Sequence, residues 1–118
     1  MSKPTALIVE DDPQLNNIFS LSLKNTFEIT TCMDGSEALR QLENMVPAIV
    51  ILDLNLPGAS GTEILNYIRA NSQFEKTRVI LATADERSAN ELEHKADLVL
   101  LKPISPIQLG TLASRFVS

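Results

Sequence analysis

Acidic residues follow two apolar segments of this sequence, in positions where a buried strand would end. Glu10, Asp11 and Asp12 come directly after "ALIV". Asp53 follows the apolar run "AIVIL". Two unit charges about 4 Å apart repel each other by roughly 4 kcal/mol at an effective dielectric constant near 20. A chain that concentrates acids at the edge of a core is therefore expected to hold a positive group there.

A hydroxyl and an ammonium group follow two further apolar segments. Thr83 comes after "VILA", and Lys102 comes after "LVLL". Together with the acids, these groups suit the transfer of a phosphoryl group to a carboxylate. Asp53 would be the nucleophile that forms an acyl phosphate, while Lys102 and Thr83 would bind phosphoryl oxygens. Catalysis of this type consists mostly of positioning and electrostatics.

The acids also predict a metal site. Glu10, Asp11 and Asp53 could hold a divalent cation that prefers oxygen ligands. Mg²⁺ fits this description better than Ca²⁺, because Mg²⁺ keeps several waters and takes only one or two carboxylates from a protein. The bound metal would neutralise both the repulsion among the acids and the charge of an incoming phosphoryl group.

Short apolar segments alternate with segments of helical periodicity along the chain. The expected strands are residues 6–10, 27–32 (at an edge), 48–54 (buried on both faces), 79–84 and 98–102. The expected helices are residues 13–25, a segment capped by Ser36, a segment after the loop 55–61, a short polar helix in 85–95, and a segment opening at Ser105 and Pro106. This order predicts a single-domain α/β fold, a doubly wound parallel sheet with helices on both faces. Functional residues of such a sheet gather at the carboxyl ends of its strands.

The first expected helix has a clear start and a clear apolar face. Asp12 is expected to be its N-cap, with Pro13 at the first helical position. Residues at helical spacing predict the face that packs on the core: Leu15, Ile18, Phe19 and Leu23. A role of Asp12 as a metal ligand remains a second possibility.

Composition restricts the classes of function. The chain has 118 residues, a net charge of −5 and ten scattered Lys and Arg residues, so direct binding to nucleic acid is not expected. No apolar segment approaches the roughly 20 residues that span a bilayer, and the N-terminus lacks a signal-peptide pattern. The single cysteine, Cys32, is expected to be a buried thiol in a reducing compartment, and the cytoplasm is the predicted location.

Four motifs together resemble the receiver domain of two-component response regulators, the CheY-like family. These are "IVEDD", "VILDLNLPGASG", "LATAD" and "LLKP", which span residues 8–103 in that order. The resemblance implies one receiver domain over residues 1–118, with no output domain in the chain. It also implies the flavodoxin-like (βα)5 sheet of strand order 2-1-3-4-5.

The resemblance also implies roles for individual residues. Asp53 corresponds to the phosphoacceptor, and Glu10 and Asp11 to the acid pair that binds Mg²⁺, for which Mn²⁺ can substitute. Asn55 corresponds to the residue whose backbone carbonyl completes the metal site. Thr83 corresponds to the switch hydroxyl and Lys102 to the phosphate-binding lysine.

Further positions follow from the same resemblance. Asn55 and Asp85 correspond to positions that tune hydrolysis of the acyl phosphate, and a cis bond before Pro103 is the form typical of the family. The expected phosphodonor is the phosphohistidine of a histidine kinase or a phosphotransfer protein, and a downstream output domain or protein is a possible second partner. Such a chain promotes reactions of its own aspartate and is not an enzyme for free substrates.

Two departures from the family pattern concern the readout of the signal. Many receivers have an aromatic residue three positions before the lysine, where this sequence has Val99. A valine cannot report phosphorylation by a large rotamer change. The interval from Thr83 to Lys102 is also short, at 19 residues, and the shortening falls on the expected helix in 85–95.

Two other functions remain alternatives. A pseudo-receiver would keep the fold and some site residues but act only as an interaction module without phosphate, which Val99 and the short helix favour. A small phosphatase is suggested by "DLN" at 53–55, which is similar to the Asp-x-Asp of haloacid-dehalogenase-like enzymes. In those enzymes, however, the nucleophile follows the first strand, whereas Asp53 follows the third.

Overall fold

Strands and helices alternate five times along the chain, in the predicted order. A computed structural model describes residues 3–117; residues 1, 2 and 118 of the expected single domain lie outside the described residues. The strands are β1 (Thr5–Val9), β2 (Glu28–Cys32), β3 (Ile49–Asp53), β4 (Arg78–Thr83) and β5 (Leu98–Leu101). The helices are α1 (Pro13–Leu23), α2 (Gly35–Asn44), α3 (Gly61–Ala70), α4 (Glu86–Leu92) and α5 (Pro106–Arg115), with a short 3-10 helix, η1 (Ser72–Phe74), before β4.

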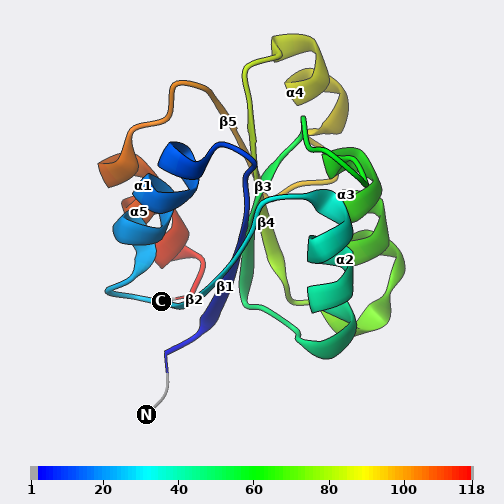
Figure 1. The fold of residues 1–118 in the computed structure, drawn as a ribbon, viewed down its shortest axis with the longest axis horizontal. Helices are drawn as coiled ribbons and strands as arrows, with labels where there is room; N and C mark the ends of the chain where they lie inside the picture. The colour runs from blue at the N-terminus through cyan, green and yellow to red at the C-terminus, as the bar shows by residue number, and fades with distance from the viewer. Residues whose placement is uncertain (1–2, 118) are drawn as a thin grey trace.

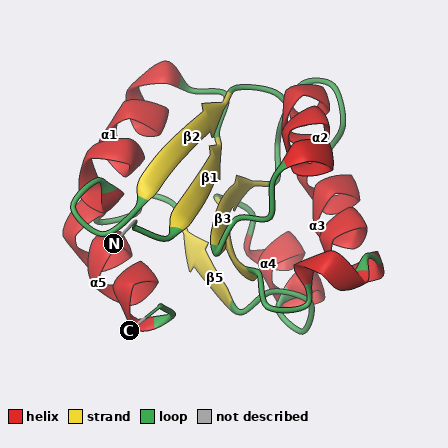
Figure 2. Cartoon of the chain, turned by 90° about the horizontal axis from the view of Figure 1, so that it is seen from below, coloured by secondary structure: helices red, strands yellow, loops and turns green. Residues whose placement is uncertain are grey.

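The five strands form one parallel sheet in the order β2-β1-β3-β4-β5. This confirms the predicted strand order and the edge position of the second strand. Helices α1 and α5 cover one face of the sheet, and α2, α3 and α4 lie on the other (Figure 1, Figure 2). All five residues of β3 are buried, because this central strand has helices on both sides.

Helix starts follow side-chain caps, with one departure from prediction. Asp12 is the N-cap of α1 and accepts the N–H of Gln14 at 2.9 Å, as expected. Ser105 likewise caps α5. The second helix was expected to be capped by Ser36, but Asp34 is its N-cap and accepts the N–H of Glu37 at 2.8 Å. A carboxylate at this position compensates the positive end of the helix better than a hydroxyl does, and the helix begins two residues earlier than predicted, at Gly35.

The buried face of α1 is rotated relative to the prediction. Phe19 and Leu23 are buried as expected, but Ile18 is 38% exposed. Asn16 takes a buried place instead, with only 6% of its surface exposed. Its side-chain amide donates to the carbonyl oxygens of Glu10 at 3.0 Å and of Cys32 at 3.1 Å. With these two bonds in place, the buried residues of α1 are Asn16, Phe19 and Leu23.

Helix α4 is short, as the sequence indicated. It has seven residues, of which Ala89 is the buried one.

Cys32 is a free, buried cysteine at the end of β2. Burial, with the nearby charge of Glu37, raises the pKa of the Cys32 thiol to about 12, which makes it a poor nucleophile.

No helix in the described range 3–117 is long and apolar enough to cross a bilayer.

Candidate functional site at the carboxyl ends of the strands

Three carboxylates meet where β1 and β3 end. The register of these strands pairs Val9 with Leu52, so the residues that follow, Glu10 and Asp53, come to lie at the same edge of the sheet. Both are almost fully buried, with 1% and 3% of their surface exposed, whereas Asp11 beside them is exposed. One carboxylate oxygen from each of the three acids lies within 4.8 Å of the others.

Lys102 faces the two buried carboxylates from the end of β5. Its Nζ lies 2.9 Å from Glu10 Oε1 and 3.5 Å from Asp53 Oδ2. The backbone N–H of Lys102 donates to Thr83 O at 2.8 Å, which fixes the lysine beside the end of β4. The following bond, Lys102–Pro103, is cis, as the resemblance implied. The expected convergence of the acids and the lysine at one edge is therefore present.

The electrostatics of this cluster are those of crowded acids around one ammonium group. Burial, reinforced by the charge of Glu10, raises the pKa of Asp53 to about 6, although Lys102 opposes the shift. Burial alone would lower the pKa of Lys102, but Glu10 and Asp53 outweigh it and hold that pKa above its ordinary value. Lys102 therefore stays charged at neutral pH. Three carboxylates against this ammonium group leave the cluster with excess negative charge.

The donor set fits a hard divalent cation. All three clustered ligands are carboxylate oxygens, one of them from an exposed residue, so water can complete the coordination shell. Asp12 lies outside this cluster, because its carboxylate is engaged as the N-cap of α1. Asn55, expected to offer its backbone carbonyl, is exposed and donates its N–H to Asp53 Oδ1 at 3.3 Å. The two oxygens of Asp53 thus have different partners, Asn55 at Oδ1 and Lys102 at Oδ2.

Thr83 lies at the same edge and connects the site to α4. Strands β3 and β4 pair Asp53 with Ala82, and Thr83 follows one residue later. The Thr83 side chain is buried, and its Oγ1 accepts the N–H of Asp85, the N-cap residue of α4, at 3.1 Å. This bond uses the hydroxyl oxygen as an acceptor, so the same group can donate its proton to an oxygen of a group attached to Asp53.

Asn16 supports the site and was missed by the sequence reasoning. By bonding the carbonyls of Glu10 and Cys32, its amide holds the ends of β1 and β2 together below the acid cluster. The signal in the sequence was a polar residue in helical register with the apolar Phe19 and Leu23. A buried asparagine at such a position is expected to bond backbone groups, because an unsatisfied buried amide is costly.

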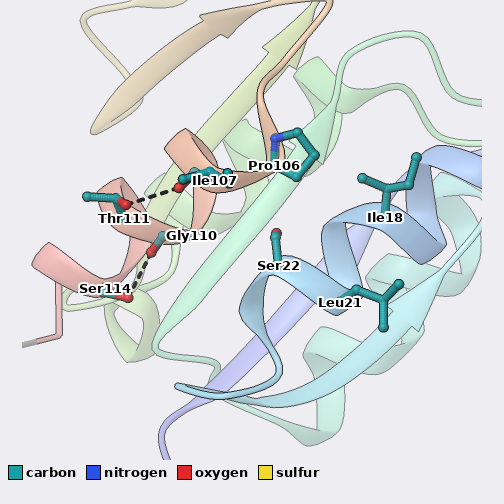
Figure 3. A pocket seen from close by; sticks show the side chains of 8 residues that line it. All are labelled: Ile18, Leu21, Ser22, Pro106, Ile107, Gly110, Thr111 and Ser114. Atoms are coloured by element: carbon teal, nitrogen blue, oxygen red, sulfur yellow. Dashed lines mark hydrogen bonds between the residues drawn. The ribbon is translucent and has the colours of Figure 1, made fainter.

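An apolar groove runs between α1 and α5 (Figure 3). Its volume is about 520 Å³, and its lining includes Ile18, Leu21 and Ser22 from α1 and Pro106, Ile107 and Gly110 from α5. Ile107 is 83% exposed and Leu21 53%. The lining residues, all within the described part of the chain, are uncharged. The groove begins at Pro106, three residues after the cis bond that follows Lys102.

Comparisons with known proteins agree with this geometry. The family described as "Response regulator receiver domain" matches residues 6–114. The DNA-binding response regulator MtrA of Mycolicibacterium smegmatis is 33% identical over 104 residues, which cover 87% of this chain and 46% of that protein. The hybrid signal transduction histidine kinase D of Dictyostelium discoideum is 30% identical over 83 residues, 70% of this chain and 5% of that protein. The chain thus spans less than half the length of either protein.

A solved structure shows the same fold over almost the whole chain. The beryllofluoride-activated receiver domain of DrrB, a Thermotoga maritima protein, superposes with a TM-score of 0.88 at 28% sequence identity. The match covers 98% of this chain and 97% of that one.

Proposed function

This chain belongs to the response regulator receiver family, and we propose that it accepts a phosphoryl group on Asp53 from the phosphohistidine of a histidine kinase or a phosphotransfer protein. The observation that supports this most is the buried pair of Glu10 and Asp53, which shares one ammonium group and stands beside the exposed Asp11. In this reaction the chain acts on its own aspartate and not on a free substrate. Two-component signalling in the cytoplasm is the proposed setting, with which the free thiol of Cys32 is consistent.

The proposed chemistry is an in-line transfer to a carboxylate. Glu10, Asp11 and Asp53, with the backbone carbonyl of Asn55, would hold Mg²⁺ or Mn²⁺, which would neutralise charge on the phosphoryl oxygens. An oxygen of Asp53 attacks phosphorus, the P–N bond of the donor breaks, and its electron pair stays on the imidazole nitrogen. Lys102 donates to one phosphoryl oxygen and the hydroxyl of Thr83 to another. The N–H of Asn55 holds Asp53 Oδ1 and so orients the nucleophile.

Beryllofluoride, an analogue of the acyl phosphate, tests this site directly. We expect it to bind the chain only when Mg²⁺ is present, because without the cation the cluster already carries excess negative charge. Fluorine NMR of the bound species measures this. The matched control is Asp12→Asn, which changes an acid at the N-cap of α1 outside the cluster and should bind like the wild type. No binding by the wild type at millimolar Mg²⁺ would instead favour the pseudo-receiver alternative.

The groove between α1 and α5 supports docking of the phosphodonor as part of this function. A donor that reaches Asp53 must lie over the edge where α1 begins and where Lys102 is followed by α5. The groove lies between these two helices, and its exposed apolar residues offer area that a helical partner can bury. We therefore assign this face to the histidine-bearing partner, with Ile107 as the most exposed contact.

Ile107→Glu is expected to separate docking from chemistry. Burial of an uncharged polar group in apolar surroundings already costs roughly 1–3 kcal/mol, and a charge costs more. Phosphotransfer from the partner kinase, found by profiling candidate kinases, should therefore slow about tenfold or more. Phosphorylation by acetyl phosphate should stay unchanged, because a small donor does not need the groove. Val46→Glu is the matched control, since Val46 is also exposed (56%) and does not line the groove. Equal loss with both donors would contradict the assignment of this face.

The proposed output is a shift between two conformations that partners distinguish. The bond from the N–H of Asp85 to Thr83 Oγ1 links the switch hydroxyl to the start of α4. Val99 is half-buried against the core on the α2–α3 side, so the signal is proposed to leave through α4 rather than through an aromatic rotamer. An output domain or a separate protein would read this change; MtrA, a relative, is named as DNA-binding, and here contact with DNA would need such a partner.

A further inference from the structure

The loop that follows Asp53 is pressed against the first turn of α2. The N–H of Gly35 donates to Pro57 O at 3.0 Å. Gly35 is buried, and a Cβ atom on it would lie 1.7 Å from Ala59 O and 2.6 Å from Ala59 C. Both of the atoms that it would strike belong to the backbone, so no side-chain movement can relieve the overlap. The two backbones approach this closely only because residue 35 has no side chain.

The loop residue between Pro57 and Ala59 is also a glycine. Gly58 has φ of +76°, a conformation that L side chains rarely adopt, and a Cβ on it would come within 2.7 Å of Ser36 Oγ. Helices α2 and α3 lie side by side on the same face of the sheet (Figure 1, Figure 2). The loop therefore crosses from β3 to α3 over the N-terminal end of α2.

The other end of the loop is held just as tightly. Gly61, the first residue of α3, donates its N–H to Leu54 O at 3.2 Å. A Cβ on Gly61 would lie 2.4 Å from Asp53 O. The loop is thus fixed next to Asp53 by α3 and at residues 57–59 by α2. Asn55 lies between these two supports, and its N–H reaches Asp53 Oδ1 at 3.3 Å, a length that a small displacement would break.

We propose that Gly35 is a positioning residue for the metal site: through its contact with Pro57 and Ala59, α2 holds the loop that carries the Asn55 carbonyl and orients the Asp53 carboxylate. This inference rests on the proposed function, because it concerns the same metal site. It assigns a role in that site to α2, a helix that contributes none of the acids.

Gly35→Ala tests the proposal. In the metal-free chain, we expect faster hydrogen exchange and shifted NMR signals for the amides of Asn55 and Gly61, because the added methyl group displaces the loop. We also expect the Mg²⁺ dissociation constant, measured by calorimetry, to rise about tenfold. Gly110→Ala is the matched control: a Cβ there would lie 2.7 Å from Ser22 O, in the contact between α1 and α5. It should unsettle packing without changing Mg²⁺ affinity.

The outcomes separate this inference from the proposed function. Unchanged Mg²⁺ affinity and unchanged loop amides in Gly35→Ala would overturn the positioning role while leaving the proposed function intact. An equal loss of affinity in Gly110→Ala would also overturn it, since general destabilisation would then explain both. If the wild type binds no Mg²⁺, the proposed function fails first. If Gly35→Ala does not fold, Gly58→Ala disturbs the same contact from the loop side and must show the same two changes.

Discussion

Replacing Asp53 with asparagine is expected to abolish phosphorylation and, in the absence of metal, to stabilise the fold. The loss of phosphorylation follows because a neutral amide is no nucleophile for phosphorus and cannot form an acyl phosphate. Incubation with acetyl phosphate and Mg²⁺, followed by intact-mass spectrometry, should show the added phosphoryl group on the wild type only. Phosphorylation of the Asn variant at the wild-type level would refute the assignment of Asp53.

The gain in stability follows from the crowding of carboxylates. The pKa of Asp53 rises from 3.8 to about 6 because of burial and the charge of Glu10. A carboxyl group with a higher pKa in the folded than in the unfolded state destabilises the fold once the pH exceeds both values. The full shift corresponds to roughly 3 kcal/mol, which we reduce to about 1–2 kcal/mol because solvent beside the exposed Asp11 and the partly exposed Lys102 screens the charges of the cluster.

Urea unfolding of the metal-free proteins measures this gain. The difference between Asp53→Asn and the wild type should be complete at pH 7 and should shrink as the pH falls from about 6 to about 4, where Asp53 becomes neutral in the folded state. Asp12→Asn makes the same chemical change at an exposed N-cap and should give no gain. A stability difference that does not depend on pH would contradict this explanation.

Replacing Lys102 with methionine is expected to have the opposite effect on stability and a large effect on phosphorylation. The ammonium group lies 2.9 Å from Glu10 Oε1 and 3.5 Å from Asp53 Oδ2, and without it two buried carboxylates face each other. Removing one partner of a fully buried ion pair costs about 3–5 kcal/mol. Because the Lys102 side chain is 22% exposed and Asp53 can take up a proton, we expect about 1–3 kcal/mol at pH 7.

Mg²⁺ should restore much of the stability that Lys102→Met loses. A cation that binds the folded chain alone stabilises it in proportion to the logarithm of its concentration over the dissociation constant. The phosphorylation rate should still fall at least tenfold, because Mg²⁺ does not replace the donor to a phosphoryl oxygen. Lys102→Arg, which keeps the charge, should stay close to the wild type in stability. Equal stability of Lys102→Met with and without Mg²⁺ would argue against a metal site at these acids.

Local patterns in the sequence determined which elements form and where they end. Alternation of apolar runs with helical periodicity was enough for the order of the strands and helices. Asp12 before Pro13 marked the start of α1 because capping depends on residues within a single turn. The acids, Thr83 and Lys102 could be assigned to one edge because the carboxyl ends of parallel strands meet there. The family resemblance added the strand order, which is confirmed.

Only the tertiary structure decided contacts between distant segments. The rotation of α1 depends on Asn16 reaching the carbonyl of Cys32, 16 residues away, so its own periodicity wrongly predicted a buried Ile18. In the same way, Lys102 lies closer to Glu10 than to Asp53 because strand register, and not sequence spacing, sets those distances. The support of the loop by Gly35 has no sequence signal beyond a glycine in a turn. Periodicity and capping are local, whereas helix rotation and ion-pair partners depend on what the rest of the fold brings alongside.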